Sequence, residues 1–385
     1  MSQSKICVPV TTRGNYGKFK SVMQAIVEHP GLELQLLVGG GALLHKYGDF
    51  VEDGELGGFE VESSLYFLLE GENPITMAKS TGIALTEFTT AFNSLKPDVV
   101  LTIADRFEEL AIATAASFQN IPLAHLEGGE VSGSVDESIR HAITKMSHLH
   151  FPASEKAAER IQKLGEPADS VYPVGATSLD VINNLDMDDM ESVESELRDK
   201  GVGGSVNLHQ DYLLVIQHPV TTEYEKNREY IDETIQAIDD LEMPTVWLWP
   251  NMDAGSDAVS KGIRVYREHS NQEHIRWYTS LPIEKYGKVL YNSACIVGNS
   301  SSGIRESSYL GVPAVNIGNR QQGRHRGSNV VDVPHNCQEI KAAISQQLDH
   351  GRYPPDDVYG DGNSGDQVAE ILSDYEFSIQ KQLTF

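Results

Sequence analysis

The amino-acid sequence predicts an α/β protein built from two doubly wound domains that face a common cleft. Short apolar runs rich in β-branched residues alternate with longer amphipathic patterns, and the alternation pauses near residue 175 and resumes at Tyr212. A length of 385 residues also suits two domains, at roughly 100 to 200 residues each. Strands separated by helices form right-handed β-α-β units, so we expect each domain to hold a parallel sheet covered by helices on both faces.

The first domain is predicted to span residues 1–175. Its β-branched apolar runs predict strands at 6–11, 34–38, 99–104, 122–126 and 148–151. After the first strand, the spacing of an amphipathic helix is followed by Phe19, Val22, Met23, Ile26 and Val27. Similar patterns predict helices at 76–95, 107–119, 137–146 and 155–164.

The second domain is predicted to span residues 176–365. It begins with an acidic, weakly patterned stretch at 186–199, and strands are then expected at 212–216, 245–249, 275–278, 294–297 and 314–317. A glycine-rich loop at 359–365 leads into a last helix, expected from 366 to about 382, so that the C-terminal segment 366–385 packs back on the first domain. Two such domains usually bind ligand between them, because each sheet presents the carboxyl ends of its strands there.

The composition limits the partners that the protein can bind. The chain has 56 acidic and 30 basic residues, which gives a net charge of -26 at pH 7. Such a surface repels phosphate backbones and anionic lipids over most of its area, so we expect neither nucleic acid nor membrane as a partner. An anionic small molecule can still bind where a local cationic pocket overrides the overall field.

The cysteines and the apolar runs indicate a cytoplasmic protein. Cys7, Cys295 and Cys337 are widely separated, so the sequence encodes neither a disulfide framework nor a thiolate metal site. The first residues lead into a short apolar run that is broken by Pro9 and Arg13, unlike a signal peptide. No run of the sequence approaches the ~18 apolar residues that span a bilayer.

Acidic side chains follow the predicted strands of the first domain. Asp105 ends one strand, Glu127 ends the next, and Asp136 precedes a predicted helix. Carboxylates that converge on one cleft are expected to raise one another's pKa by repulsion and desolvation, which suits them to act as acid and base near neutral pH. An alternative to a catalytic role for Asp136 is that it caps the N-terminus of the predicted helix that follows it. An acidic residue between a buried strand and two glycines, as at Glu127, has few structural uses.

The second domain carries a predicted anion site. Residues 299–304, with the sequence Asn-Ser-Ser-Ser-Gly-Ile, link a strand to a helix, and their backbone N–H groups and hydroxyls suit a phosphate, although such serines are also common helix caps. Glu306 follows one turn later and can accept hydrogen bonds from ribose hydroxyls. His218 ends another strand, where a lone histidine is more often structural. The cationic side chains expected to hold a diphosphate are Arg13, Lys18, Arg320, Arg324 and Arg326.

A metal site is not expected from the sequence. The spacing of His125 and Glu127 matches the start of a zinc deaminase signature, but that signature also needs a Pro-Cys-x-x-Cys segment, which the chain lacks. The acidic and amide residues at 361–366 resemble half of a calcium loop without its final glutamate, and we interpret them as a turn and a helix cap.

Taken together, these segments resemble the hydrolysing UDP-N-acetylglucosamine 2-epimerases of the sialic-acid pathway, and the similarity runs through nearly the whole chain. In family order the most specific stretches are 104–108 (Ala-Asp-Arg-Phe-Glu), 125–133 (His-Leu-Glu-Gly-Gly-Glu-Val-Ser-Gly) with Asp136 and 138–145, 217–222 (Gln-His-Pro-Val-Thr-Thr), 250–255 (Pro-Asn-Met-Asp-Ala-Gly), 298–304 and 315–318 with Arg320. The resemblance implies two Rossmann-like domains in the glycosyltransferase-B arrangement, usually as a homodimer or a tetramer.

The resemblance also implies residue roles. It assigns catalysis to Asp105, Glu127 and Asp136, and it places His218 in the same site. The positions that it assigns to UDP or to the substrate are Arg13, Lys18, Arg106, Asn251, Ser280, Ser300, Ser301, Glu306 and Arg320.

The implied reaction converts UDP-N-acetylglucosamine and water to N-acetylmannosamine and UDP, for sialic-acid-type biosynthesis and without a cofactor. Loss of the C2 proton and of UDP gives 2-acetamidoglucal, and addition of water completes the reaction. Two alternatives stay open at this point. One is the same reaction on a UDP- or GDP-linked 2,4-diacetamido-trideoxyhexose of a legionaminic-type pathway, and the other is a glycosyltransferase of the same fold, which needs an acceptor.

Overall fold

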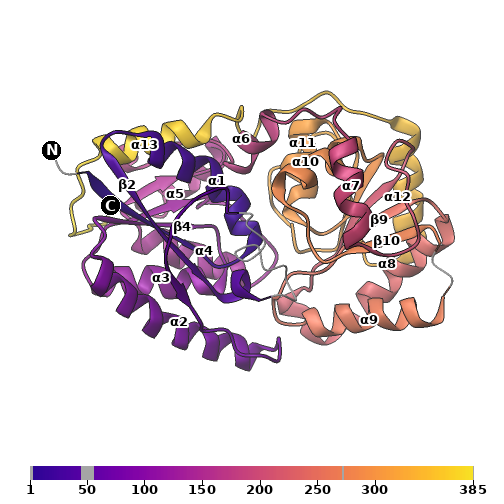
Figure 1. The fold of residues 1–385 in the computed structure, drawn as a ribbon, viewed down its shortest axis with the longest axis horizontal. Helices are drawn as coiled ribbons and strands as arrows, with labels where there is room; N and C mark the ends of the chain where they lie inside the picture. Colours follow the sequence, from indigo (N-terminus) through magenta and orange to yellow (C-terminus); the bar gives the residue numbers. More distant parts are fainter. Residues whose placement is uncertain (1–2, 45–55, 271–272, 385) are drawn as a thin grey trace.

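Two α/β domains lie side by side in the computed structural model, which describes residues 3–44, 56–270 and 273–384 (Figure 1). The first domain is built on a six-stranded sheet and the second on a seven-stranded sheet. Helix α6 (Ser178–Asn183) lies between them. It contacts α1 (Arg13–Glu28) and α13 (Ser364–Asp374) on the side of the first domain, and α10 (Ile283–Asn292) and α11 (Glu306–Leu310) of the second. The domain boundary near residue 175 stays a prediction. Within the described residues, no helix is long and apolar enough to cross a membrane.

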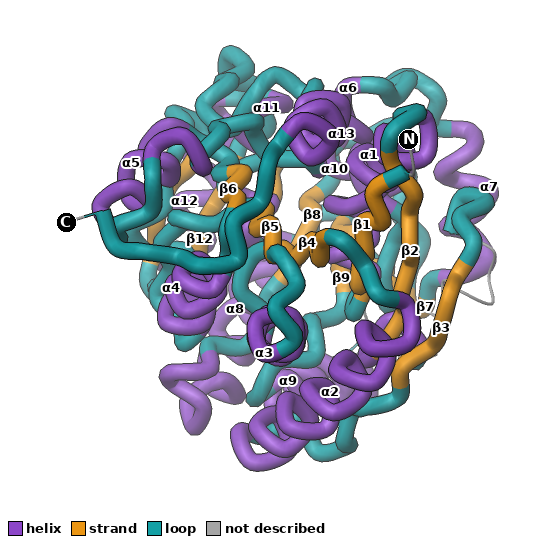
Figure 2. The backbone as a smooth tube through the Cα atoms, turned by 90° about the vertical axis from the view of Figure 1, so that its left-hand side faces the viewer, coloured by secondary structure: helices purple, strands orange, loops and turns teal. Residues whose placement is uncertain are grey.

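The sheet of the first domain is wholly parallel, with the strand order β3-β2-β1-β4-β5-β6. Its strands are β1 (Ser4–Val10), β2 (Leu32–Gly39), β3 (Val61–Leu65), β4 (Val99–Ile103), β5 (Leu123–Leu126) and β6 (Leu149–Phe151). Its helices are α1 (Arg13–Glu28), α2 (Pro74–Leu95), α3 (Phe107–Phe118), α4 (Asp136–Met146) and α5 (Glu155–Lys163). Figure 2 shows α1 on one face of this sheet and α2, α3 and α4 on the other. Every residue of β4 and β5 is buried, as expected for a sheet covered on both faces.

The sheet of the second domain has the order β13-β12-β11-β8-β9-β10-β7, and only the edge strand β7 is antiparallel among its described strands. Its strands are β7 (Val202–Gly203), β8 (Leu213–Ile216), β9 (Thr245–Leu248), β10 (Ile275–Tyr278), β11 (Cys295–Gly298), β12 (Ala314–Ile317) and β13 (Val330–Val333). Its helices are α7 (Glu191–Lys200), α8 (Asn227–Leu241), α9 (Ser256–His269), α10 (Ile283–Asn292), α11 (Glu306–Leu310) and α12 (Cys337–His350). Apolar residues of α8, α9 and α12 pack on one face and those of α7 and α10 on the other.

The strand orders locate the ligand crevice of each domain. In both sheets the chain winds outward from a central strand in one direction and then in the other, so the order reverses between β1 and β4 and again between β8 and β11. Ligands of doubly wound sheets bind at the carboxyl ends of the strands at this switch point. The loops after β1, β4, β8 and β11 are therefore expected to contribute to the site.

The C-terminal helix differs from its prediction. Helix α13 (Ser364–Asp374) packs against α1 but ends at Asp374, so the helix predicted to continue to about 382 is wrong. Tyr375 leaves the helical conformation and packs edge-to-face on Tyr172, with ring centroids 6.5 Å apart. Further along, Lys381 Nζ lies 2.8 Å from the buried Glu166 Oε2 of the first domain. These contacts hold the tail extended on the domain, and Phe385 lies outside the described residues.

The glycine-rich loop before α13 has the spacing of a dinucleotide-binding motif, with glycines at 360, 362 and 365. The helix start that would hold the pyrophosphate is occupied by Asp180, whose carboxylate accepts hydrogen bonds from the N–H groups of Ser364 (2.9 Å) and Gly365 (2.6 Å). The loop therefore serves as a connection between domains whose helix start is capped by Asp180. Asn363 holds the N-cap position, but its side chain makes no capping hydrogen bond, so the interpretation of residues 361–366 as a helix cap is wrong.

Candidate active site

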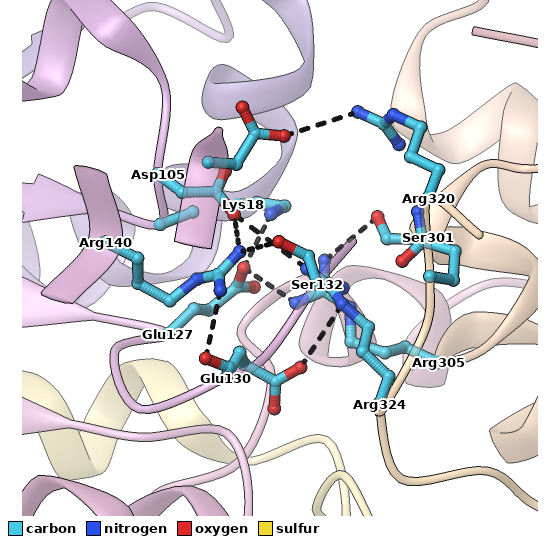
Figure 3. A pocket seen from close by; sticks show the side chains of 13 residues that line it. Lys18, Asp105, Glu127, Glu130, Ser132, Arg140, Ser301, Arg305, Arg320 and Arg324 are labelled. Atoms are coloured by element: carbon cyan, nitrogen blue, oxygen red, sulfur yellow. Dashed lines mark hydrogen bonds and ion pairs between the residues drawn. The ribbon is translucent and has the colours of Figure 1, made fainter. Parts of the chain in front are cut away.

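A cleft of about 470 Å³ lies between the domains, and its lining comes from both. It includes Arg13, Lys18 and Asp105 of the first domain, and His218 and Glu306 of the second. A smaller cavity of about 60 Å³ shares several of these residues and adds the remaining predicted carboxylates. Figure 3 shows this cavity, where carboxylates of the first domain point toward arginines of the second. A cleft of this size suits a ligand of a few hundred Å³ with anionic and polar groups.

Glu127 lies directly after β5 in a strained backbone conformation. Its φ of 57° is in the left-handed region that residues with a side chain seldom occupy, and such strain is concentrated at functional sites. The side chain is buried, and its Oε2 lies 2.6 Å from Lys18 Nζ and 2.7 Å from Arg305 Nη1. Burial raises the pKa of Glu127, but Arg305 and Lys18 outweigh burial and lower it to about 2. The carboxylate is thus ionised at neutral pH.

Asp136 lies in the first turn of α4 and is not its N-cap, because the cap position is held by Val135. The Asp136 Oδ2 accepts a hydrogen bond of 2.7 Å from the Ser134 hydroxyl, and it lies 4.0 Å from Arg320 Nη2. The capping alternative is therefore wrong. Burial and the nearby Asp253 carboxylate raise the pKa of Asp136 above its ordinary value.

Asp105 follows β4 after Ala104, which also has a left-handed φ of 60°. The guanidinium of Arg140 donates to Asp105 Oδ2 and, at 2.9 Å, to the carbonyl oxygen of Glu130. Arg324 of the second domain approaches the same carboxylate oxygen of Asp105 at 3.9 Å. Two arginines from different domains thus fix the orientation of Asp105 in the cavity.

The sequence predicts that the carboxylates raise one another's pKa. This prediction is correct in direction for Asp136 and wrong for Glu127. The pKa of Asp136 is raised, but the repelling neighbour is Asp253 of the second domain rather than another predicted carboxylate. The pKa of Glu127 is lowered, because Arg305 crosses from the second domain and pairs with it. The sequence gives no indication of this pairing.

The serine segment after β11 forms a tight turn rather than the start of a long helix. Residues Ser301–Gly303 form a 3₁₀ turn, and α11 begins only at Glu306. Glu306 is buried, and its Oε1 accepts a hydrogen bond of 2.7 Å from the Ser178 hydroxyl. In the described part of the chain its Oε2 has no hydrogen-bond partner. A buried carboxylate oxygen without a partner is costly unless a ligand hydroxyl pairs with it.

His218 is held as a neutral imidazole. Burial and Arg320 lower its pKa to about 3. Its Nδ1 accepts the backbone N–H of Asn251 at 3.1 Å, so the ring proton is on Nε2. His218 can therefore donate one hydrogen bond to a ligand in the cleft that it lines.

The remaining predicted positions also line the cleft. Arg106 lies 2.9 Å from Asp253 through its Nη1, and Arg320 Nη1 donates to the carbonyl oxygen of Asn299 at 3.2 Å. The other predicted ligand-binding residues that line the cleft are Arg13, Lys18, Asn251, Ser280, Ser300 and Ser301. The structure thus brings the predicted site residues to the cleft or to the adjoining cavity, with the exception of Arg326. Arg326 was expected to help hold a diphosphate, but its Nε lies 2.8 Å from Asp332 Oδ2 and it lines neither space. His125 instead contacts the Ala104 carbonyl oxygen at 2.9 Å, which gives it a structural role.

Sequence reasoning missed four residues of this site, which are Arg140, Ser178, Asp253 and Arg305. Arg140 follows Asp136 by one helical turn, so the spacing could have indicated it. The other three meet their partners across the domains or across long stretches of sequence. Among the described residues, no group of three or more histidine, cysteine, aspartate or glutamate side chains is arranged to hold a metal ion.

This chain is similar to known proteins of one family. A family model described as UDP-N-acetylglucosamine 2-epimerase matches residues 24–373. The chain is 33% identical over 368 residues to a UDP-N,N'-diacetylbacillosamine 2-epimerase (hydrolyzing) of Legionella pneumophila, covering 96% of this chain and 95% of the relative. It is 29% identical over 378 residues to a UDP-N-acetylglucosamine 2-epimerase of Neisseria meningitidis, covering 97% and 96%.

A solved structure supports the fold. The UDP-GlcNAc 2-epimerase from Neisseria meningitidis bound to UDP-GlcNAc aligns with a TM-score of 0.78 at 17% sequence identity, covering 96% of this chain and 99% of that one. The two-domain arrangement predicted from the sequence is confirmed.

Proposed function

The chain belongs to the UDP-N-acetylglucosamine 2-epimerase family, and we propose that it is a hydrolysing 2-epimerase that converts UDP-N-acetylglucosamine and water to N-acetylmannosamine and UDP. The observation that carries the proposal is one cavity in which Asp105, Glu127 and Asp136 of the first domain meet Ser301 and Arg320 of the second. Acid–base groups on one side and anion-binding groups on the other are what this reaction needs.

The second domain supplies the nucleotide half of the proposed site. Glu306 offers a buried carboxylate oxygen to the ribose hydroxyls, and the hydroxyls of Ser300 and Ser301 face the diphosphate together with Arg320. The neutral His218 donates its Nε2 proton to a phosphate oxygen. These donors stabilise the charge that develops on UDP as it leaves C1.

The carboxylates supply the proton transfers. In the elimination, a base takes the C2 proton, the C1=C2 double bond forms, and UDP leaves with the electron pair of the C1–O bond. In the hydration, the hydroxyl of water bonds to C1, and C2 receives a proton on its opposite face. The product N-acetylmannosamine fits sialic-acid-type biosynthesis. No cofactor takes part in either step.

A second candidate is the same reaction on a UDP- or GDP-linked 2,4-diacetamido-trideoxyhexose. The Legionella relative, which is 33% identical, is named for a substrate of that kind. Both candidates share the chemistry at C1 and C2. They differ in the substituents at C4 and C6 and, for a GDP-linked substrate, in the nucleotide.

One experiment separates these functions. The protein is incubated with each nucleotide sugar in deuterium oxide without an acceptor, and UDP and free sugar are quantified by mass spectrometry. We expect free N-acetylmannosamine with deuterium at C2. Release of UDP-N-acetylmannosamine would refute hydrolysis, turnover only with an added acceptor would indicate a glycosyltransferase, and product without deuterium would rule out elimination.

The cytoplasmic location and the homodimer or tetramer stay predictions. Light scattering during size-exclusion chromatography measures the mass of the assembly against the 42.4 kDa of one chain.

A further inference from the structure

Two carboxylates of the first domain each face a charged side chain of the second domain, and these two charges are opposite in sign. Arg305, at the residue before α11, reaches across the cleft to Glu127, and both side chains are about 2% exposed. Both Arg305 and Lys18 contact the same oxygen, Glu127 Oε2. In the described structure the other oxygen, Oε1, is buried without a hydrogen-bond partner. Glu127 is therefore held by one oxygen and presents the other to the cavity.

Asp136 faces a carboxylate instead. Asp253, in the loop after β9, shares Arg320 with it, since Arg320 Nη2 lies 3.7 Å from Asp253 and 4.0 Å from Asp136. Asp253 has a second and closer cation, Arg106, at 2.9 Å. Although burial opposes it, these two arginines lower the pKa of Asp253, whereas burial and Asp253 raise that of Asp136. Of the two neighbouring carboxylates, Asp136 is the one that holds its proton to higher pH.

We propose that Arg305 and Asp253 are positioning residues that divide the acid–base work: Arg305 makes Glu127 the proton acceptor, and Asp253 makes Asp136 the proton donor. This inference rests on the proposed function. Residues whose environments push their protonation in opposite directions are the acid and base of a site.

The division gives a balanced reaction. Glu127 takes the C2 proton while the C1–O electron pair leaves with UDP. Asp136 then gives its proton to C2 as the hydroxyl of water bonds to C1, and the remaining proton of that water returns to Asp136. Glu127 releases its proton to solvent, so each turnover consumes one water and releases one proton.

The charged groups that face each carboxylate are few, which makes the proposal testable by pH. Glu127 is faced by Arg305 and by Lys18 of α1, and Glu306 acts on both of these cations. Asp136 is faced by Asp253, Arg320, Arg106 and the Ser134 hydroxyl, which donates to it.

The first test measures kcat against pH for Arg305→Gln. Glu127 works as a base only when ionised, so kcat falls as the pH drops through its pKa. An opposite charge at this distance typically lowers a carboxyl pKa by about 1–3 units. Without Arg305 the acidic limb therefore moves up by about that amount, and Arg305→Lys restores most of the shift. An unmoved acidic limb in Arg305→Gln, with UDP binding intact by calorimetry, would overturn the role of Arg305.

The second test follows the intermediate. Asp136 works as an acid only when protonated, so the alkaline limb of Asp253→Asn moves to lower pH. Hydration then slows while elimination continues, and 2-acetamidoglucal accumulates. In Arg305→Gln elimination itself slows at a pH below the shifted acidic limb, so little of this intermediate is released there. The opposite pattern, with the intermediate released by Arg305→Gln alone, would exchange the two roles and overturn the proposal.

A third measurement needs no variant. In the unsubstituted protein the fraction of product that leaves as 2-acetamidoglucal should rise with pH, because Asp136 loses its proton. A fraction independent of pH would overturn its role as the donor.

Matched controls for the two variants are Arg264→Gln and Asp257→Asn, members of a surface ion pair of 3.3 Å whose side chains are 54% and 71% exposed. Both control variants should keep the acidic and alkaline limbs of the wild-type profile of kcat against pH. If the unsubstituted protein releases no UDP from any nucleotide sugar, the proposed function has failed, whereas normal turnover with unmoved limbs overturns only this inference.

Discussion

Replacement of Asp136 by Asn removes a titrating proton and leaves the size of the side chain unchanged. In the structure, Asp136 accepts a hydrogen bond of 2.7 Å from the Ser134 hydroxyl, and the oxygen of an asparagine amide can accept the same bond. The helix cap is Val135, so the substitution removes no capping interaction. What the variant loses is the ability to donate a proton.

The effect on stability is expected to be small and the effect on rate large. The ion pair with Arg320 is long, at 4.0 Å, and the Asp136 side chain is 20% exposed, so its loss costs about 0–1 kcal/mol. Relief of the repulsion by Asp253 acts in the opposite direction. A general acid typically contributes about 10²- to 10⁴-fold to a rate, so kcat should fall at least 100-fold.

The assay combines UDP release, calorimetric UDP affinity and the thermal midpoint of unfolding. We expect a loss of kcat with nearly unchanged affinity and midpoint. Glu155→Gln is the control, because Glu155 occupies the corresponding first turn of α5 outside the cleft. Full activity of Asp136→Asn would refute the reasoning and leave the proton transfers to Asp105 and Glu127. A lower midpoint with full UDP release from the remaining folded protein would indicate a structural role instead.

Three further predictions concern binding, domain contact and stability. Ser301→Ala and Glu306→Ala should weaken UDP binding in calorimetry without changing the fold, and wild-type affinity in both would remove the second domain from the site. Gly133→Ala places a Cβ 2.0 Å from the carbonyl oxygen of Asn319 across the cleft, so kcat should fall by about 10²-fold as the catalytic groups are displaced, and an unchanged kcat would contradict this. Two cations outweigh burial and leave Glu127 with a pKa of about 2 instead of 4.5, so it should contribute about 3 kcal/mol of stability above pH 4.5. This contribution is lost as the pH falls toward 2, and the difference in thermal midpoint between wild type and Glu127→Gln should shrink over the same range. A difference that is constant with pH would contradict the depressed pKa.

The central strands were predictable because burial on both faces leaves an unmistakable pattern. Four of the five residues of β4 are apolar, the exception being Thr102, and all five are buried. Of the edge strands that the structure describes, β3, β7 and β13 were not predicted, whereas the buried β6 was. In β3 the three central residues, 62–64, are polar and exposed, and β7 has only two residues. An edge strand with one neighbour needs no continuous apolar run, so its sequence resembles that of a loop.

The site was predictable where a side chain belongs to a strand end. Asp105 and Glu127 follow adjacent parallel strands, whose carboxyl ends meet at one edge of the sheet. Asp253 and Arg305 were not predicted as partners, because their roles depend on contacts across the two domains. Arg305 pairs with a carboxylate 178 positions earlier in the chain, a distance obtained from the numbers 305 and 127. The hydrophobic periodicity of each segment predicts its local structure but does not indicate how the two domains are oriented relative to each other.

If the proposed function holds, the contacts of Arg305 and Asp253 with the first domain also determine when the site is reactive. Arg305 lies between Ser301 and Glu306 of the proposed nucleotide site, and Asp253 adjoins Asn251. A nucleotide held by the second domain therefore moves together with the two charges that act on Glu127 and Asp136. Coulomb interactions weaken with distance and with the entry of water, so an open cleft loses both effects. If the proposed function holds, we therefore expect the acid and the base to be assembled only when the second domain, with its bound nucleotide, is in contact with the first.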